Sequence, residues 1–476
     1  MNKTTLLLAL TIFSLAGCGS LESANSSSSL SPRLGSEKQN IALSDTQFYS
    51  KNNEVTWHQL QHTPLPTLQE AQATSQDPTA KGWLNLATIS KKYSTNPAQL
   101  IKELQTWRSS NPSHPGNNLF PDDNTLSSIA ATPPPKHIAI LLPLHGSMAA
   151  SGQIIRSGFL SAYYENMGQS TTQIKGQTVS FYDTNENPDL GALYQKVQAE
   201  GADLIVGPLT KTEVENLYHL RQFNAPVLAL NYTNTSLFNT LPSNFYEFGL
   251  SPVEETQQIL DKARQAGRSQ ALVITSDDAW GHRIMDALNS SWKANGGTIT
   301  DTLYFSKQTN LTQAIASLLH INPKEDQALM RENNNRATLA QQRRQDFDVI
   351  FVFAQPDSAR QIVPLLRYYY IGNVPIYSIS TIYSGYPNPL RDKDLDGVTF
   401  SELPWIIQMA HSSSNTPGQC DHLYAIGRDA YLLSQSLPRL NALPNFPIYG
   451  ATGALSMNQQ KISQRLPVVT MHDGRI

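Results

Sequence analysis

The sequence predicts an α/β fold of two doubly wound lobes, preceded by a short all-helical segment. From His137 onward, short apolar runs typical of buried strands alternate with segments of helical spacing. Such β-α-β alternation requires a parallel sheet with helices on both faces. The alternation repeats from Glu254 onward, which indicates a second lobe. A crevice is then expected between the lobes, at the carboxyl ends of the strands.

Each predicted element follows from its apolar spacing or from a continuous buried run such as Ile138–Leu142. In the first lobe we expect strands at 137–142, 179–182, 202–206 and 226–230, and helices at 152–167, 190–199 and 210–223. In the second lobe we expect strands at 271–275, 298–304, 348–353 and 375–380. The helices expected there are 254–265, 280–294, 311–319, 357–369 and 423–437.

The N-terminus has the pattern of an export signal at residues 1–17, with Lys3 before a short apolar run. Leu15-Ala16-Gly17-Cys18 then resembles the lipobox of bacterial lipoproteins, in which the cysteine thiol receives the lipid. Cys18 is therefore the expected lipidation site, and its acyl chains would supply the membrane anchor. Gly19, in place of an aspartate, favours the outer membrane. The alternative is an ordinary cleaved signal peptide followed by a chance cysteine.

Three segments separate this signal from the lobes. Residues 18–60, with the serine run 26–29, are expected to form a flexible tether because they lack apolar periodicity. Residues 61–115 are predicted to be a short helical, repeat-like region with Trp83 and Trp107 among its apolar positions. Residues 116–136 are predicted to be a proline-rich linker, and 137–476 the two-lobed domain.

Composition excludes several classes of function. The formal net charge is −3, so no basic field indicates a nucleic-acid partner. The only cysteines are Cys18 and Cys420, and no CxxC or Cys/His spacing predicts a metal site. We find no GxGxxG, Walker, HExxH or GxSxG motif, so no cofactor, metal or catalytic residue is expected. A dispersed Ser/His/Asp triad is the alternative that a sequence leaves open.

The loops that follow the predicted strands are the candidate ligand contacts, because free N–H groups at helix starts can hold an anion. In the first lobe these residues are Leu144, His145, Gly146, Ser147, Pro208, Leu209, Thr210, Asn231 and Tyr232. In the second lobe they are Ser276, Asp277 and Trp280. The alternative is that they are turn and cap residues without a ligand, with Thr210 capping its helix.

Several longer motifs resemble the LppC/LpoA lipoprotein family, activators of a penicillin-binding protein. The most specific is the run 343–385, RRQDFDVIFVFAQPDSARQIVPLLRYYYIGNVPIYSISTIYSG. Further similar motifs are IAILLPLHG at 138–146, GPLTK at 207–211, ALN at 229–231, FGLSP at 248–252, WG at 280–281, LPW at 403–405, LYAIG at 423–427 and GATG at 450–453. The resemblance covers about 137–476 together with 82–107.

This resemblance implies a type I periplasmic-binding-protein fold in an outer-membrane lipoprotein on the periplasmic side. It also implies a regulator, not an enzyme, that binds a bifunctional penicillin-binding protein and stimulates peptidoglycan transpeptidation allosterically. Family members commonly have a much longer N-terminal helical repeat domain than 61–115 here. A lipid-anchored solute receptor is the alternative, and a cell-wall hydrolase a third possibility; a receptor requires polar and aromatic side chains that converge in the crevice.

Overall fold

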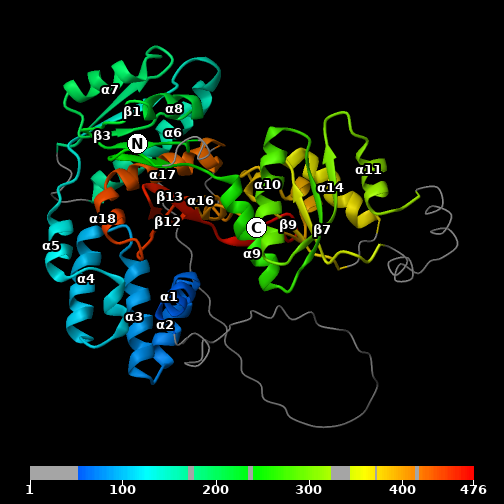
Figure 1. Ribbon diagram of the computed structural model, residues 1–476, viewed down its shortest axis with the longest axis horizontal. Coiled ribbons are helices and arrows are strands. Elements are labelled where there is room, and N and C mark those ends of the chain that lie inside the picture. Colours follow the sequence, from blue (N-terminus) through cyan, green and yellow to red (C-terminus); the bar gives the residue numbers. More distant parts are fainter. Residues whose placement is uncertain (1–51, 170–175, 234–239, 323–343, 370–372, 413–416) are drawn as a thin grey trace, which may run out of the picture. The chain divides into compact units, whose positions relative to one another are not determined.

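The computed structural model describes residues 52–169, 176–233, 240–322, 344–369, 373–412 and 417–476 (Figure 1). The expected signal peptide, Cys18 and residues 18–51 of the expected tether lie outside the described residues. Within the described part, no helix combines the length and apolar character that crossing a bilayer requires.

The N-terminal helices α1–α5 form what we call the helical region. They are α1 (Asn53–His62), α2 (Leu65–Thr74), α3 (Pro78–Lys92), α4 (Pro97–Ser110) and α5 (Asp123–Ala131), with the 3₁₀ turn η1 (Pro115–Leu119) before α5. Polar side chains cap four of these helices, namely Asn52, Asp77, Asn96 and Asp122. The structure differs from the prediction at both ends of the helical region. Helix α1 lies partly within the predicted tether, and α5 lies within the predicted linker, because each has its own cap and at least one buried apolar residue.

The first lobe contains an eight-stranded sheet in the order β11-β12-β13-β5-β4-β3-β1-β2. Its strands are β1 (His137–Leu142), β2 (Thr178–Asp183), β3 (Leu204–Val206), β4 (Val227–Ala229), β5 (Phe245–Phe248), β11 (Ile448–Gly450), β12 (Gly453–Asn458) and β13 (Lys461–Arg465). The first five strands pair in parallel, whereas β11, β12 and β13 pair antiparallel with one another. The parallel strands β1–β4 were predicted, but β5 was not. Strand β13 pairs in parallel with β5, and this pairing joins the C-terminal strands to the rest of the sheet.

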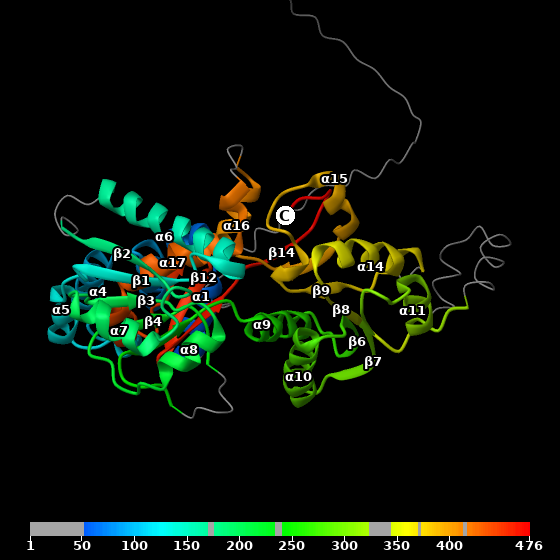
Figure 2. The same ribbon diagram turned by 90° about the horizontal axis from the view of Figure 1, so that it is seen from above.

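Helices cover both faces of this sheet (Figure 2). Alternate residues of β1 enter two cores, one shared with α6 (Ala149–Gln169) and α17 (His422–Ser434), the other with α7 (Leu190–Ala199) and α8 (Lys211–Tyr218). Helices α6 and α17 approach closely at Gly158 and Gly427. A Cβ at Gly158 would lie 2.0 Å from the carbonyl oxygen of Tyr424, so a larger residue cannot occupy that position. Helix α18 (Leu437–Ala442) follows α17.

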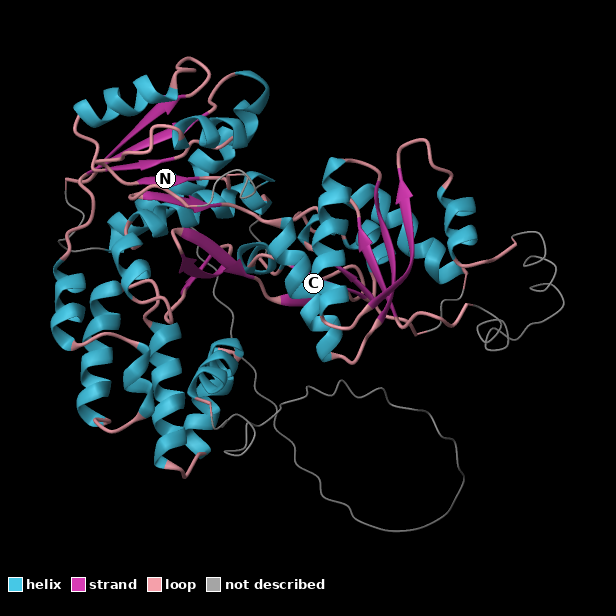
Figure 3. Cartoon of the chain, viewed as in Figure 1, coloured by secondary structure: helices cyan, strands magenta, loops and turns pink. Residues whose placement is uncertain are grey.

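The second lobe contains a six-stranded sheet in the order β14-β10-β9-β8-β6-β7. Figure 3 shows strands in magenta and helices in cyan. Its strands are β6 (Gln270–Ser276), β7 (Thr298–Phe305), β8 (Val349–Phe353), β9 (Ile376–Ser378), β10 (Val398–Ser401) and β14 (Val468–Thr470). Its helices are α9 (Pro252–Gln265), α10 (Ala279–Ala294), α11 (Leu311–Leu318), α14 (Pro356–Tyr368), α15 (Pro389–Asp392) and α16 (Pro404–Ala410). Strand β14 is antiparallel to β10, and the other pairs are parallel.

The chain passes between the two sheets three times. It leaves the first sheet after β5 and enters α9, and it returns after β10 through α16 to α17. It crosses again between β13 and β14, which belong to different sheets. The predicted two-lobed α/β fold is thus confirmed, with three connections that sequence periodicity did not reveal.

Candidate functional site

The loop after β1 holds the predicted residues Leu144–Ser147. The 3₁₀ turn η2 (Gly146–Met148) joins the loop to α6, and Gly146 has a positive φ of 71° beside the side chain of Asn185. A side chain at Gly152 is excluded, because its Cβ would lie 2.1 Å from the carbonyl oxygen of Pro143. The loop is therefore packed tightly against the start of α6, and its side chains at His145 and Ser147 are exposed.

This loop meets the end of β2, which the sequence analysis did not single out. Asp183, the last residue of β2, is almost completely buried, and its Oδ1 accepts N–H bonds from Leu144 (2.9 Å) and Asn185 (3.0 Å). His145 Nδ1 contacts Asp183 Oδ2, and it lies 3.6 Å from Glu186 Oε1.

The charges of this pair reinforce one another. Although burial raises the pKa of Asp183, its bonds to Leu144, His145 and Asn185 hold that pKa below the usual value. The hydrogen bond with Asp183 correspondingly raises the pKa of His145.

The other first-lobe residues are committed to structural contacts. Thr210 caps α8 in a capping box with Glu213, as the cap prediction required. Asn231 Nδ2 donates to the carbonyl of Leu209 (3.0 Å), next to the cis peptide bond between Gly207 and Pro208. The hydroxyl of Tyr232 donates to the carbonyls of Gly249 (2.9 Å) and Ile462 (2.8 Å), and burial raises its pKa. These side chains join neighbouring strand ends.

The second-lobe residues Ser276, Asp277 and Trp280 lie together at the end of β6. The cap of α10 is Asp278, whose Oδ1 accepts from the N–H groups of Trp280 (2.9 Å) and Gly281 (2.8 Å). The neighbouring Asp277 is exposed, and its Oδ1 lies 3.2 Å from His282 Nε2. Trp280 is half-buried against the core between β6 and α10.

The twelve predicted contacts form separate groups at the strand ends. Among the described residues, the hydrogen bonds and ion pairs of the first-lobe loops and of the second-lobe loop stay within their own lobes. Their role as ligand contacts stays a prediction.

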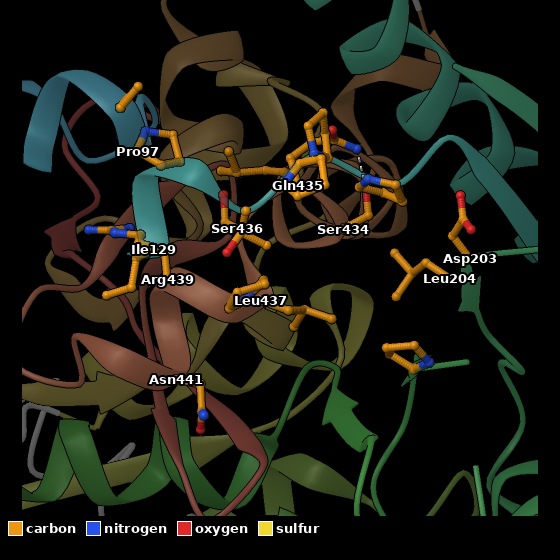
Figure 4. Close-up of a pocket in the computed structure, with 18 of the residues that line it drawn as sticks. Pro97, Ile129, Asp203, Leu204, Ser434, Gln435, Ser436, Leu437, Arg439 and Asn441 are labelled. Atoms are coloured by element: carbon orange, nitrogen blue, oxygen red, sulfur yellow. Dashed lines mark hydrogen bonds between the residues drawn. The ribbon is translucent and has the colours of Figure 1, made fainter. Parts of the chain in front are cut away.

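A cavity of about 1310 Å³ lies at the opposite, amino ends of the first-lobe strands. Figure 4 shows Pro97 and Ile129 from the helical region, Asp203 and Leu204 from the start of β3, and residues of α17 and α18 around it. Pro133–Pro135 and Tyr246 also line it. The cavity thus lies where the helical region meets the first lobe.

Arg439 of α18 lines this cavity and links the helical region to the first lobe. Its guanidinium is almost fully buried and donates to the carbonyls of Ser94 (3.0 Å) and Phe446 (3.0 Å). Burial lowers its pKa to about 10. The indole N–H of Trp57 donates to Asn445 (2.8 Å), and Leu443 and Phe446 complete the core of the helical region.

Buried carboxylates lie where the two lobes meet. Glu255 of α9 accepts from the N–H of Ser380 (3.0 Å) and the hydroxyl of Ser401 (2.9 Å), and burial raises its pKa. Glu402 has no exposed surface and lies 3.0 Å from Nε2 of His422. Although burial lowers the pKa of His422, Glu402 and other carboxylates raise it to about 9.

Comparison with known proteins identifies relatives over most of the chain. The family model described as "LppC putative lipoprotein" matches residues 29–469. Penicillin-binding protein activator LpoA of Photobacterium profundum is 26% identical over 427 residues, which cover 87% of this chain and 68% of that relative. The protein of the same name from Vibrio cholerae is 27% identical over 448 residues, covering 91% of this chain and 71% of that relative.

Solved structures share the fold. Full-length LpoA from Haemophilus influenzae matches with a TM-score of 0.56 and 24% identity, over 91% of this chain and 75% of its own. A candidate branched-chain amino acid ABC transporter from Chromobacterium violaceum matches with a TM-score of 0.52 and 22% identity, over 70% of this chain and 99% of its own. The periplasmic-binding-protein-like fold expected from the resemblance is therefore confirmed. Because the family model spans most of its residues, the chain belongs to the LppC lipoprotein family.

Proposed function

We propose that this chain is a lipid-anchored periplasmic regulator that binds and activates a bifunctional penicillin-binding protein, stimulating its transpeptidase activity. Membership of the LppC family over residues 29–469 is the observation that carries the proposal. The relatives in Photobacterium profundum and Vibrio cholerae are named as activators of a penicillin-binding protein. The C-domain of Haemophilus influenzae LpoA is described as a regulator of PBP1A. On this proposal the chain has no catalytic activity of its own.

The arrangement of the predicted contacts favours a regulator over a solute receptor. A receptor of this fold requires side chains that face a ligand from both lobes. Here the hydroxyl of Tyr232 and the amide of Asn231 bond backbone carbonyls of their own lobe, and Thr210 caps a helix. Activation requires that the chain bind the active state of the synthase more tightly than its inactive state.

The anchor is the second part of the proposal. The thiol of Cys18 in Leu15-Ala16-Gly17-Cys18 is the group proposed to receive the lipid, and Gly19, in place of an aspartate, favours the outer membrane. The lipid would hold the chain on the periplasmic side of that membrane, with residues 19–51 between anchor and α1. A Cys18→Ser variant should then fail to incorporate labelled palmitate and should leave the outer-membrane fraction. Incorporation at the wild-type level in Cys18→Ser would contradict this part.

The activity is tested by peptide cross-linking with purified bifunctional penicillin-binding proteins, with and without the full-length chain in detergent. A rise in cross-linking with one synthase, saturating with the concentration of the chain, supports the proposal. A matched addition of heat-denatured chain controls for detergent and lipid. No change with any of the synthases that bind the chain would refute activation and give the receptor function precedence.

A further inference from the structure

The His145–Asp183–Glu186 cluster brings three possible ligand atoms together at the carboxyl ends of β1 and β2. One atom from each side chain lies within 4.8 Å of the other two. His145 lies in the loop after β1, whereas Asp183 ends β2 and Glu186 follows it. His145 and Asp183 are 38 positions apart, so no local spacing in the sequence indicates the cluster. The expectation that the chain has no metal site rested on such spacing alone.

Asp183 is held in place before any ion binds. Its Oδ1 is occupied by the N–H groups of Leu144 and Asn185, which leaves Oδ2 directed at His145. The side chain of Asn185 in turn donates to the carbonyl of His145 and joins the two loops. Partners that fix the orientation of a ligand in this way strengthen metal binding.

The cluster is negative even when His145 is charged, because two carboxylates face one imidazole. Among the described residues, neither Asp183 nor Glu186 forms an ion pair with a lysine or arginine. Asp183 is only 6% exposed, so its charge is shielded from water. His145 and Glu186 are exposed, which leaves room for an ion and for water ligands.

We propose that His145, Asp183 and Glu186 form a binding site for a divalent transition-metal ion such as Zn²⁺. An imidazole with two carboxylates is a donor set that such ions prefer, whereas Mg²⁺ and Ca²⁺ favour oxygen ligands alone. Ligand atoms around tetrahedral zinc are separated by about 3.3 Å, given bonds of about 2.0 Å. His145 Nδ1 lies 3.6 Å from Glu186 Oε1 but is hydrogen-bonded directly to Asp183 Oδ2. An entering ion would therefore displace the Nδ1 proton and turn the exposed imidazole away from Asp183, and both exposed side chains have the space for that rotation.

The second lobe supplies an internal control. Asp277 and His282 form a similar pair at the end of β6, 3.2 Å apart and exposed, but no third ligand atom joins them in the described part of the chain. A histidine and a carboxylate alone should bind zinc far more weakly than the three-residue site.

The test is a zinc titration of the full-length chain in detergent, in competition with a chromophoric chelator. We expect one site per chain that weakens by about 100-fold in His145→Ala and at least about 10-fold in Glu186→Gln, while His282→Ala leaves it unchanged. Zinc should also raise the midpoint of thermal unfolding of the wild type but not of His145→Ala. The proposal is overturned if the wild type binds zinc no more tightly than His145→Ala, or if His282→Ala weakens binding equally.

Discussion

The first lobe has two junctions, one with the helical region and one with the second lobe. Each junction contains buried charged side chains. At the helical junction the buried charge is a guanidinium, that of Arg439, bonded to two backbone carbonyls. At the junction between lobes the buried charges are the carboxylates of Glu255 and Glu402, with His422 beside the latter. An arginine stays charged over the whole physiological range, whereas a histidine next to a carboxylate titrates. The contact made by Arg439 should therefore be insensitive to pH between 6 and 9, and that made by His422 sensitive to it.

The largest expected effect is that of Arg439→Ala. The change removes two charge-assisted hydrogen bonds and leaves the carbonyls of Ser94 and Phe446 unpaired, which should cost about 3–4 kcal/mol of unfolding free energy. Denaturant unfolding at several pH values between 6 and 9 measures it, and the loss should be the same at each. Arg439→Lys should recover only part of the loss, because lysine lacks the planar fork.

Arg391→Ala is the matched control, since this arginine is exposed on the second lobe. A loss in Arg439→Ala no greater than in Arg391→Ala would show that the helical region does not depend on this contact.

The next effect is the pH dependence that His422 imposes. Its pKa in the folded chain is raised to about 9 from 6.5, so its contribution to stability is complete below pH 6.5 and lost as the pH rises through about 9. The contribution at pH 6 should be on the order of 2–3 kcal/mol. In His422→Gln the unfolding free energy should depend less on pH between 6.5 and 9 than it does in the wild type. The difference in unfolding free energy between wild type and variant should therefore be largest at pH 6 and should shrink towards pH 9.

His282→Gln, at an exposed histidine, should retain the wild-type slope. If the unfolding free energies of wild type and His422→Gln differ by the same amount at pH 6 and at pH 9, the contrast between the two junctions is refuted.

The smallest expected effect concerns the hydrogen bond between Trp57 and Asn445 at the helical junction. Trp57→Phe removes the hydrogen bond from the indole N–H to the carbonyl of Asn445. It should lower the unfolding free energy by about 1 kcal/mol more than a Trp→Phe change that only makes the ring smaller. Trp83→Phe is the matched control, because Trp83 lies in the same core and its buried indole N–H has no hydrogen-bond partner among the described residues. The two variants are compared by thermal unfolding. Equal losses would show that the hydrogen bond adds nothing to this junction.

Local pattern was sufficient to predict most of the fold. Continuous apolar runs such as Ile138–Leu142 and Val349–Phe353 form interior strands of the two sheets, and Thr210 caps its helix as predicted. The strands β5, β10 and β11–β14 were missed, because they are short and polar side chains interrupt several of them, as in Lys461–Arg465. The place of β11–β13 in the first sheet depends on the pairing of β13 with β5, which no local window contains.

The site residues were harder to predict for a similar reason. Charged residues such as Arg439, Glu255 and Glu402 are normally exposed, so a sequence gives no sign that these three are buried. Asp183 ends a strand that was predicted, but its role depends on the loop after β1, which lies 38 positions away. Conversely, Tyr232 and Asn231 have the residue types of a binding site, and the structure uses them to join strands.

The three passages of the chain between the sheets have a consequence for the order in which the protein folds. The strands that complete the first sheet, β11–β13, are synthesised long after α1–α5, and so is the surface around Phe446 on which the helical region rests. The helical region must therefore wait for these later residues before its core can close. Contacts between such distant segments slow folding and prolong the exposure of apolar surface. A chain that stops before Ile448 would lose both the edge of its first sheet and the crossing into β14, and we expect it to aggregate or be degraded.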